Sequence, residues 1–248
     1  MILNPYRYSA AGVAFDGFGN ASRSFDGVND FIDISDSDDH SFGDSVNDSP
    51  FSVCAWVKMV DATHFWIATK HNNSTQAEWI FAIGGDDKLY FAAYDGSQTT
   101  YRGLTSVSTL TSYEGQWIHL AATYDGSGGT SAQDGMTTYL TTFGGSTSAI
   151  SSVDFTAGTY TAMHNGTQDL EIGSWTSNSR YANGNIADVR IYDKELSSAD
   201  VQSLADGTDV QDSLIGWWLD DDNDVLDNAG TNDGTNNGST YSTDGPAD

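Results

Sequence analysis

The chain has 248 residues, with 35 Asp or Glu against 9 Lys or Arg and a formal net charge of −26 at pH 7. A charge of this sign repels nucleic acid and anionic membranes at long range, so neither is an expected partner. The length suits one large all-β domain with a full core. Cys54 is the single cysteine, so no disulfide can form within the chain.

Residues 1–21 are expected to form an extended N-terminal arm. The opening Met-Ile-Leu-Asn-Pro-Tyr-Arg-Tyr lacks a basic segment followed by an apolar one, so no Sec-type signal is predicted. No apolar run elsewhere approaches the length needed to cross a membrane, and membrane insertion is not expected.

Two segments near opposite ends of the chain look like the two ends of one β-sandwich. Residues 25–34 read Phe-Asp-Gly-Val-Asn-Asp-Phe-Ile-Asp-Ile, and residues 184–192 read Gly-Asn-Ile-Ala-Asp-Val-Arg-Ile-Tyr. Each combines a short strand with a Gly-containing turn and surplus carboxylates, which are oxygen ligands for a hard cation. The intervening segment 36–40, Asp-Ser-Asp-Asp-His, is interpreted as a solvated loop.

The middle of the chain has the period-two pattern of antiparallel strands, separated by clusters of Gly, Asp, Asn and Ser. The predicted strands are Phe51 to Met59, Phe65 to Lys70, Trp79 to Ile83, Lys88 to Tyr94, Trp117 to Tyr124, Thr137 to Thr142, Leu170 to Gly173 and Ile186 to Tyr192. Trp56, Trp117 and His119 lie inside these apolar runs and are expected to be structural.

Two loop-rich stretches carry the aromatic and short polar side chains that a sugar-binding site needs. The candidate ligand-binding residues are Trp66, His71, Trp79, Tyr101 and Arg102 in the first stretch, and Trp175, Arg180 and Tyr181 in the second. Alternation along the strands leaves open whether Trp66 and Trp79 face a ligand or the core.

The segment from Lys194 to Ala205 is the exception to the strand pattern. Ser197 precedes Ser-Ala-Asp, and Val201, Leu204 and Ala205 recur at helical spacing, which predicts a short capped helix. Residues 207–248 hold one apolar strand, Leu-Ile-Gly-Trp-Trp-Leu at 214–219, and an acidic Asn/Gly-rich tail. This segment either completes the sandwich or belongs to an interface with another chain.

Five motifs in order resemble the concanavalin A-like, laminin-G-like jelly-roll family over residues 22–206. They begin at Ser24 (SFDGVNDFIDI), Phe51 (FSVCAWVK), Gly115 (GQWIHLAATYD), Leu170 (LEIG) and Gly184 (GNIADVRIYDKELS). The resemblance implies an all-β, antiparallel two-sheet jelly-roll sandwich with one short helix near its C-terminal end. It also implies a calcium ion joining the first and last strands, with Asp26, Asn29, Asp30 and Asp188 in the ligand positions. The first eight residues are also similar to the starts of some bacteriophage tail and structural proteins.

Catalysis is not predicted. Hydrolases with this fold carry closely spaced glutamates, whereas Glu78, Glu114, Glu171 and Glu195 are all more than ten residues apart. Known nucleophile, zinc and phosphate-binding motifs are absent from the sequence. A lyase remains an alternative if His64, His71, Tyr94 and Tyr101 converge in space.

The favoured hypothesis is a non-catalytic, calcium-binding carbohydrate-recognition module that acts in adhesion, outside a cell or on a virion surface. Its expected ligand is a glycan, and a homo-oligomer or other virion proteins are possible partners. The alternatives are a virion structural protein that binds other proteins, with an apolar patch at Trp217 and Trp218, and a polysaccharide lyase or hydrolase.

Overall fold

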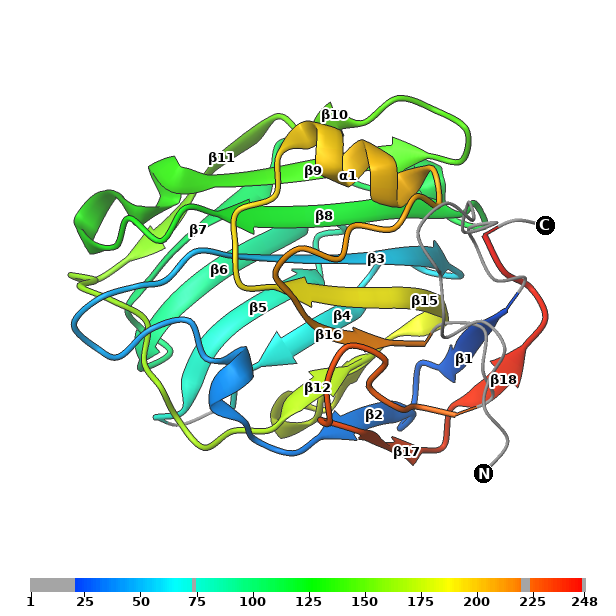
Figure 1. The fold of residues 1–248 in the computed structure, drawn as a ribbon, viewed down its shortest axis with the longest axis horizontal. Helices are drawn as coiled ribbons and strands as arrows, with labels where there is room; N and C mark the ends of the chain where they lie inside the picture. The colour runs from blue at the N-terminus through cyan, green and yellow to red at the C-terminus, as the bar shows by residue number, and fades with distance from the viewer. Residues whose placement is uncertain (1–20, 73–74, 220–223, 247–248) are drawn as a thin grey trace.

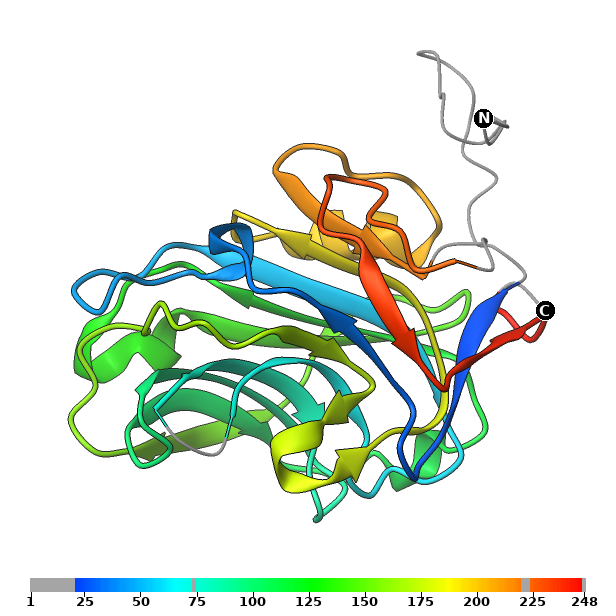
Figure 2. The same cartoon turned by 90° about the horizontal axis from the view of Figure 1, so that it is seen from below.

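The computed structural model describes residues 21–72, 75–219 and 224–246, and these residues form a sandwich of two antiparallel sheets (Figures 1 and 2). We call the sheet that carries the helix in Figure 1 the front sheet and the other the back sheet. Every strand pairing among the described residues is antiparallel. The predicted all-β, two-sheet jelly-roll fold is confirmed, whereas the expected arm lies outside the described residues apart from Ala21.

The front sheet runs from one edge to the other in the order β10 (Ser148–Ala149), β9 (Met136–Thr142), β8 (Ile118–Tyr124), β3 (Phe51–Met59), β15 (Asn183–Tyr192), β1 (Ser22–Asp26) and β18 (Thr240–Ser242). A further strand, β16 (Leu214–Trp218), also pairs with β15. The back sheet runs in the order β11 (Ser152–Ala157), β7 (Tyr101–Ser106), β6 (Leu89–Gly96), β5 (Ala77–Ile83), β4 (Trp66–Lys70), β12 (Leu170–Ile172), β2 (Phe31–Ile34) and β17 (Gly234–Asn237). A small hairpin of β13 (Ser174–Trp175) and β14 (Arg180–Tyr181) lies beside the back sheet (Figure 2).

The main core lies between the two sheets because alternate residues of each strand point inward. Its centre is aromatic: the rings of Phe42 and Phe51 stack with centroids 4.1 Å apart, and Trp79 packs against both. The expectation that Trp56, Trp117 and His119 are structural holds, since all three side chains are buried.

The predicted helix is present as α1 (Ser198–Ala205). Its capping box is complete: Ser197 accepts from the Asp200 backbone N–H, and the Asp200 carboxylate accepts from the Ser197 backbone N–H. The buried face of α1 packs with Cys54 and Tyr192 on the outer side of the front sheet (Figure 1). Within the described residues, no helix is both long and apolar enough for a membrane span.

The C-terminal segment completes the sandwich within this chain. It supplies β16 and β18 to the front sheet and β17 to the back sheet. Trp218 is fully buried in the core. The neighbouring Trp217 ring lies 4.3 Å from the Arg190 guanidinium carbon and donates its indole N–H to Asp188. Trp217 and Trp218 therefore do not form the flat apolar patch that would favour the structural-protein alternative.

Removing the Trp218 side chain should expose how much the fold depends on this segment. We expect Trp218→Ala to lower the free energy of unfolding by about 3–5 kcal/mol, because it leaves a large cavity in the core. Tyr241→Ala, at a partly exposed position of the same segment, should change it by less than about 1 kcal/mol. Urea unfolding of both variants measures the difference, and equal effects would contradict an integral C-terminal segment.

Candidate functional site

Seven aromatic rings form a connected group on the outer face of the back sheet, which we call the aromatic cluster. Its members are Trp66, His71, Tyr90, Tyr94, Tyr101, Phe155 and Trp175. The centroid separations are 4.9 Å for Tyr90 and Phe155, 4.4 Å for Phe155 and Tyr101, 5.2 Å for Tyr101 and Tyr94, 4.6 Å for Tyr94 and His71, 4.9 Å for His71 and Trp175, and 4.8 Å for Trp175 and Trp66. Four of the predicted ligand-binding residues, from both predicted stretches, are therefore brought together.

Strand alternation explains why these rings share one face. In β6, Leu89, Phe91 and Ala93 belong to the main core, so Tyr90 and Tyr94 point to the opposite face. Register then places Tyr90 and Trp66 on either side of Ala82, since each pairs with that residue. The group of rings is thus arranged around a floor of small and aliphatic residues, Ala82, Ala92 and Ile80.

The rings differ in how much they face solvent. Trp66, His71 and Tyr94 are only 7%, 3% and 6% exposed. Tyr90, Tyr101, Phe155 and Trp175 are partly exposed and lie over the buried members. The exposed members are those that can contact a ligand directly, and the buried ones support them.

The cluster is uncharged near neutral pH. Burial lowers the pKa of His71 to about 4 and raises the pKa of Tyr94. Within the described part of the chain, the indole nitrogens of Trp66 and Trp175 and the Nδ1 atom of His71 have no hydrogen-bond partner. These three atoms are themselves buried, so the surface that faces solvent is apolar and neutral, and such a surface suits an uncharged ligand better than an ionic one.

Two predicted ligand-binding residues are not at this surface, and the expectation for them is corrected. Trp79 is fully buried in the main core, where its indole N–H donates to the His40 carbonyl at 2.9 Å. Arg102 is 6% exposed, and its guanidinium donates to the backbone carbonyls of Tyr101, Thr130, Ala157 and Gly158. Both point inward because their neighbours in the strand occupy the outer face.

The remaining two predicted residues lie on β14, beside the cluster. Arg180 pairs with Trp175 across the β13–β14 hairpin. The Tyr181 ring lies against Phe31, with ring centroids 6.5 Å apart. Tyr90 and Phe155 were not among the predicted binding residues, although the alternation of Tyr90, Ala92 and Tyr94 in β6 is a signal that could have identified Tyr90.

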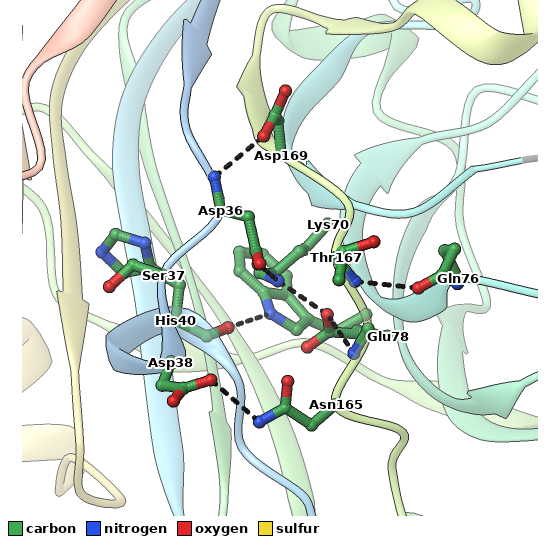
Figure 3. Close-up of polar contacts among 12 residues, drawn as sticks. Asp36, Ser37, Asp38, His40, Lys70, Gln76, Glu78, Asn165, Thr167 and Asp169 are labelled. Atoms are coloured by element: carbon green, nitrogen blue, oxygen red, sulfur yellow. Dashed lines mark hydrogen bonds and ion pairs between the residues drawn. The ribbon is translucent and has the colours of Figure 1, made fainter.

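A buried charge network lies at the end of β4, next to the cluster (Figure 3). The amino group of Lys70, a fully buried residue, contacts Glu78 Oε1 and Asp36 Oδ1, each at 2.6 Å. Glu78 is also fully buried, and burial raises its pKa while Lys70 opposes the shift. A charge pair this deep is maintained only when both groups remain hydrogen-bonded.

The network fastens two loops to the back sheet (Figure 3). The backbone N–H of Gly166 donates to Glu78, and that of Thr167 donates to Gln76. On the other loop, the backbone N–H of Asp36 donates to Asp169 at 2.8 Å. Because Lys70 directly precedes His71, the network also fixes the strand end that carries the buried histidine of the cluster.

The interpretation of residues 36–40 as a solvated loop holds for the three exposed aspartates but is wrong for His40. Asp38–His40 forms a short 3₁₀ helix, η1, and the His40 side chain is fully buried. Its ring lies against Trp218 with centroids 5.4 Å apart. The error arose because Asp38 and Asp39 indicate exposure, whereas the contact with a tryptophan 178 positions away is invisible to local sequence patterns.

The four calcium positions implied by the resemblance do not form one site. Asp26, Asn29 and Asp30 share the β1–β2 turn, where Asp30 accepts from the Asp26 backbone N–H. Asp26 pairs with Asn183, so Asp188 lies about 15 Å farther along β15. Asp188 Oδ1 accepts from both Arg190 Nε and the Trp217 indole. Within the described ranges, no group of three or more His, Cys, Asp or Glu side chains is arranged to hold a metal ion.

The family model of the concanavalin A-like lectin/glucanases superfamily matches residues 26–202, and the chain belongs to this superfamily. A candidate carbohydrate-binding protein from Bacteroides ovatus is similar in structure, with a TM-score of 0.57 and 17% identity. That match covers 91% of this chain but only 60% of the Bacteroides chain. The heptameric SAP-like pentraxin of Limulus polyphemus has a TM-score of 0.54 and 14% identity, covering 93% of this chain and 96% of its own. No curated protein matches in sequence.

Breaking the buried charge network should destabilise the fold strongly. We expect Lys70→Ala to lower the free energy of unfolding by about 3–5 kcal/mol, because Glu78 is then left buried without its partner. The double variant Lys70→Met/Glu78→Gln should recover part of the loss, since no buried charge remains. Lys194→Ala removes a more exposed pair with Asp212 and should cost no more than about 1 kcal/mol. Similar urea midpoints for Lys70→Ala and Lys194→Ala would contradict a stabilising role for the buried pair of Lys70 and Glu78.

Three buried histidines should make the fold sensitive to acid. Burial lowers the pKa of His40, His71 and His119 from 6.5 to about 4. The unfolded chain therefore takes up these protons at higher pH than the folded chain, so stability is full above about pH 6.5 and falls as the pH drops toward 4. Each histidine contributes at most about 1.4 kcal/mol per pH unit.

His119→Leu tests this dependence, because it removes one of the three groups. The raised pKa values of Asp48 and Glu78 act in the opposite direction, so the comparison with the unmodified protein isolates the histidine contribution. Melting temperatures measured between pH 6.5 and 5 should fall less steeply for the variant. Parallel curves would show that protonation of His119 does not destabilise the fold.

Proposed function

We propose that this chain is a non-catalytic module that binds carbohydrate, with the aromatic cluster as its binding surface. The observation that carries the proposal is the set of partly exposed rings of Tyr90, Tyr101, Phe155 and Trp175 on one face of the back sheet. Pyranose rings present an apolar face that packs on aromatic side chains, while their hydroxyls bond to polar tips such as tyrosine hydroxyls and indole N–H groups.

The character of the surface supports an uncharged glycan. The net charge of −26 disfavours anionic polymers at long range. The cluster itself holds no charged side chain near pH 7, since burial keeps His71 neutral by lowering its pKa. The structural similarity to the Bacteroides protein is consistent with sugar binding, although at 17% identity it shows only the shared fold.

A polysaccharide lyase is the second candidate, because His71, Tyr94 and Tyr101 converge as that alternative requires. His64 does not join them through a ring contact; its ring lies against Gly85. His71 and Tyr94 are almost fully buried, and the pKa of Tyr94 is raised rather than lowered. A general base must reach the proton that it removes, so this geometry favours binding over turnover.

Calcium dependence, a homo-oligomer and a location outside a cell or on a virion remain predictions from the sequence. In the proposed calcium set, Asp188 Oδ1 already accepts from Arg190 and Trp217, and the residue lies about 15 Å along the strand from the partner of Asp26. Any calcium effect is therefore expected to depend on Asp26, Asn29 and Asp30 in the β1–β2 turn, whose oxygens are of the kind that calcium prefers.

Isothermal titration with neutral oligosaccharides, chosen from a glycan array, tests the proposal. Tyr101→Ala and Trp175→Ala should each weaken binding by about tenfold or more, because each removes an aromatic contact. Phe143→Ala is the matched control, since this ring is 52% exposed but belongs to the front-sheet side of the molecule. Unchanged affinity in both cluster variants would overturn the proposal, and product formation lost with His71→Ala would favour the lyase.

The same titrations with EDTA, and then with calcium or magnesium restored, address the metal. A calcium-specific gain in affinity or melting temperature that Asp30→Ala abolishes and Asp188→Ala retains would place the ion at the β1–β2 turn. Equal behaviour in EDTA and calcium would contradict the calcium prediction and leave the glycan proposal unaffected.

A further inference from the structure

A hollow of about 580 Å³ lies at one edge of the sandwich. The strands β10 and β11 at this edge are labelled in Figure 1. One wall comes from β9 and β10 of the front sheet, and the other from residues 108–113, which follow β7 of the back sheet. This volume is within the range of small-molecule sites. It is separate from the aromatic cluster, with which it shares no residue.

The lining of the hollow has no charged side chain. In a chain with 35 acidic residues this is a distinctive feature, because most of its other loops carry aspartate. Instead, hydroxyl groups line the hollow, from Ser108, Thr109, Ser112, Ser146, Ser148 and Ser151. Hydroxyls both donate and accept hydrogen bonds, so they match a ligand that does the same.

The back of the hollow is apolar. Leu110 is buried in the main core, and Leu140 and Ile150 pack against that core while still lining the hollow. An apolar back wall with a hydroxyl-bearing rim complements a ligand that has one apolar face and several uncharged polar groups. It does not complement an ion, whose charge would find no partner among the lining residues.

Side chains from outside the hollow hold both walls in place. Gln202 of α1 accepts from the Thr147 backbone N–H at 2.6 Å and donates to the Gly145 carbonyl at 3.2 Å. On the other wall, Asp87 accepts from the Thr111 hydroxyl through its carboxylate and from the Leu110 N–H through its backbone carbonyl. The hollow is therefore formed before any ligand arrives, which lowers the entropic cost of binding.

We propose that this hollow is a second binding site and that its ligand is an uncharged sugar residue. The hollow shares no residue with the aromatic cluster. An experiment that finds no binding at one site therefore leaves the proposal for the other site intact. The exposed Val153 on β11 lies between the hollow and Phe155 of the cluster. Ser151 and Phe155 are four residues apart, which is about 13 Å along an extended strand.

Amide chemical-shift mapping by NMR tests the second site, with N-acetylglucosamine and glucose as neutral probes and glucuronate as the charged probe. We expect the neutral probes at millimolar concentration to shift the amide signals of Ser112, Ser148 and Ile150, and glucuronate to shift them several-fold less. Signals of Ala92 and Gly103, on the strands beneath the cluster, report separately on the proposed function.

Two filling variants give the decisive comparison. Ala149→Trp and Thr109→Trp occupy the hollow from opposite walls at exposed positions, and each should reduce the shifts at Ser112 and Ile150 at least fivefold. Val46→Trp adds the same ring at an exposed position of a distant loop and should leave them unchanged. Neutral-probe shifts that persist in both filling variants, equal shifts with glucuronate, or no shifts at saturation would each overturn the proposal.

Discussion

The buried amino group of Lys70 is the constraint on which the proposed site depends. A lysine in a protein core is tolerated only when its charge is matched, and Glu78 and Asp36 supply that match at 2.6 Å. Satisfying Glu78 in turn fixes the loop at Gly166, and positioning Asp36 fixes the loop that leads to η1. One buried charge therefore determines the path of two loops, and the strand end that it fixes carries His71 into the aromatic cluster.

The two faces of the back sheet have different roles. The inner side holds the core rings, including Trp79, whose indole fastens η1 through the His40 carbonyl. The outer side holds a second set of rings, the aromatic cluster, to which the β13–β14 hairpin adds Trp175. Period-two alternation thus produces both the stability of the sandwich and a surface suited to sugar rings.

Much of the fold could be predicted because its signals are local. The strands from Phe51 to Met59 and from Ile186 to Tyr192, and the capping box at Ser197, depend on residues close in sequence. The site was predicted only in part. Trp66 and Trp79 lie thirteen residues apart with similar surroundings, but Trp79 alternates into the core with Phe81 and Ile83. Trp66 faces outward, and β4 has a register shift between Trp66 and Ala68 that interrupts its alternation. The roles of Asp188 and His40 depend on Trp217 and Trp218, contacts that alternation cannot predict.

Sugar binding at the aromatic cluster is tested most directly by following the seven tryptophan indole N–H signals by NMR while a neutral oligosaccharide is added. The indoles of Trp66 and Trp175 lie in the cluster without hydrogen-bond partners in the described chain, whereas those of Trp79 and Trp218 are bonded to backbone carbonyls inside the core. If sugar binds at the aromatic cluster, the Trp66 and Trp175 signals will move together with one binding constant while the Trp79 and Trp218 signals stay in place. Binding that leaves the Trp66 and Trp175 signals unmoved would contradict binding at the cluster.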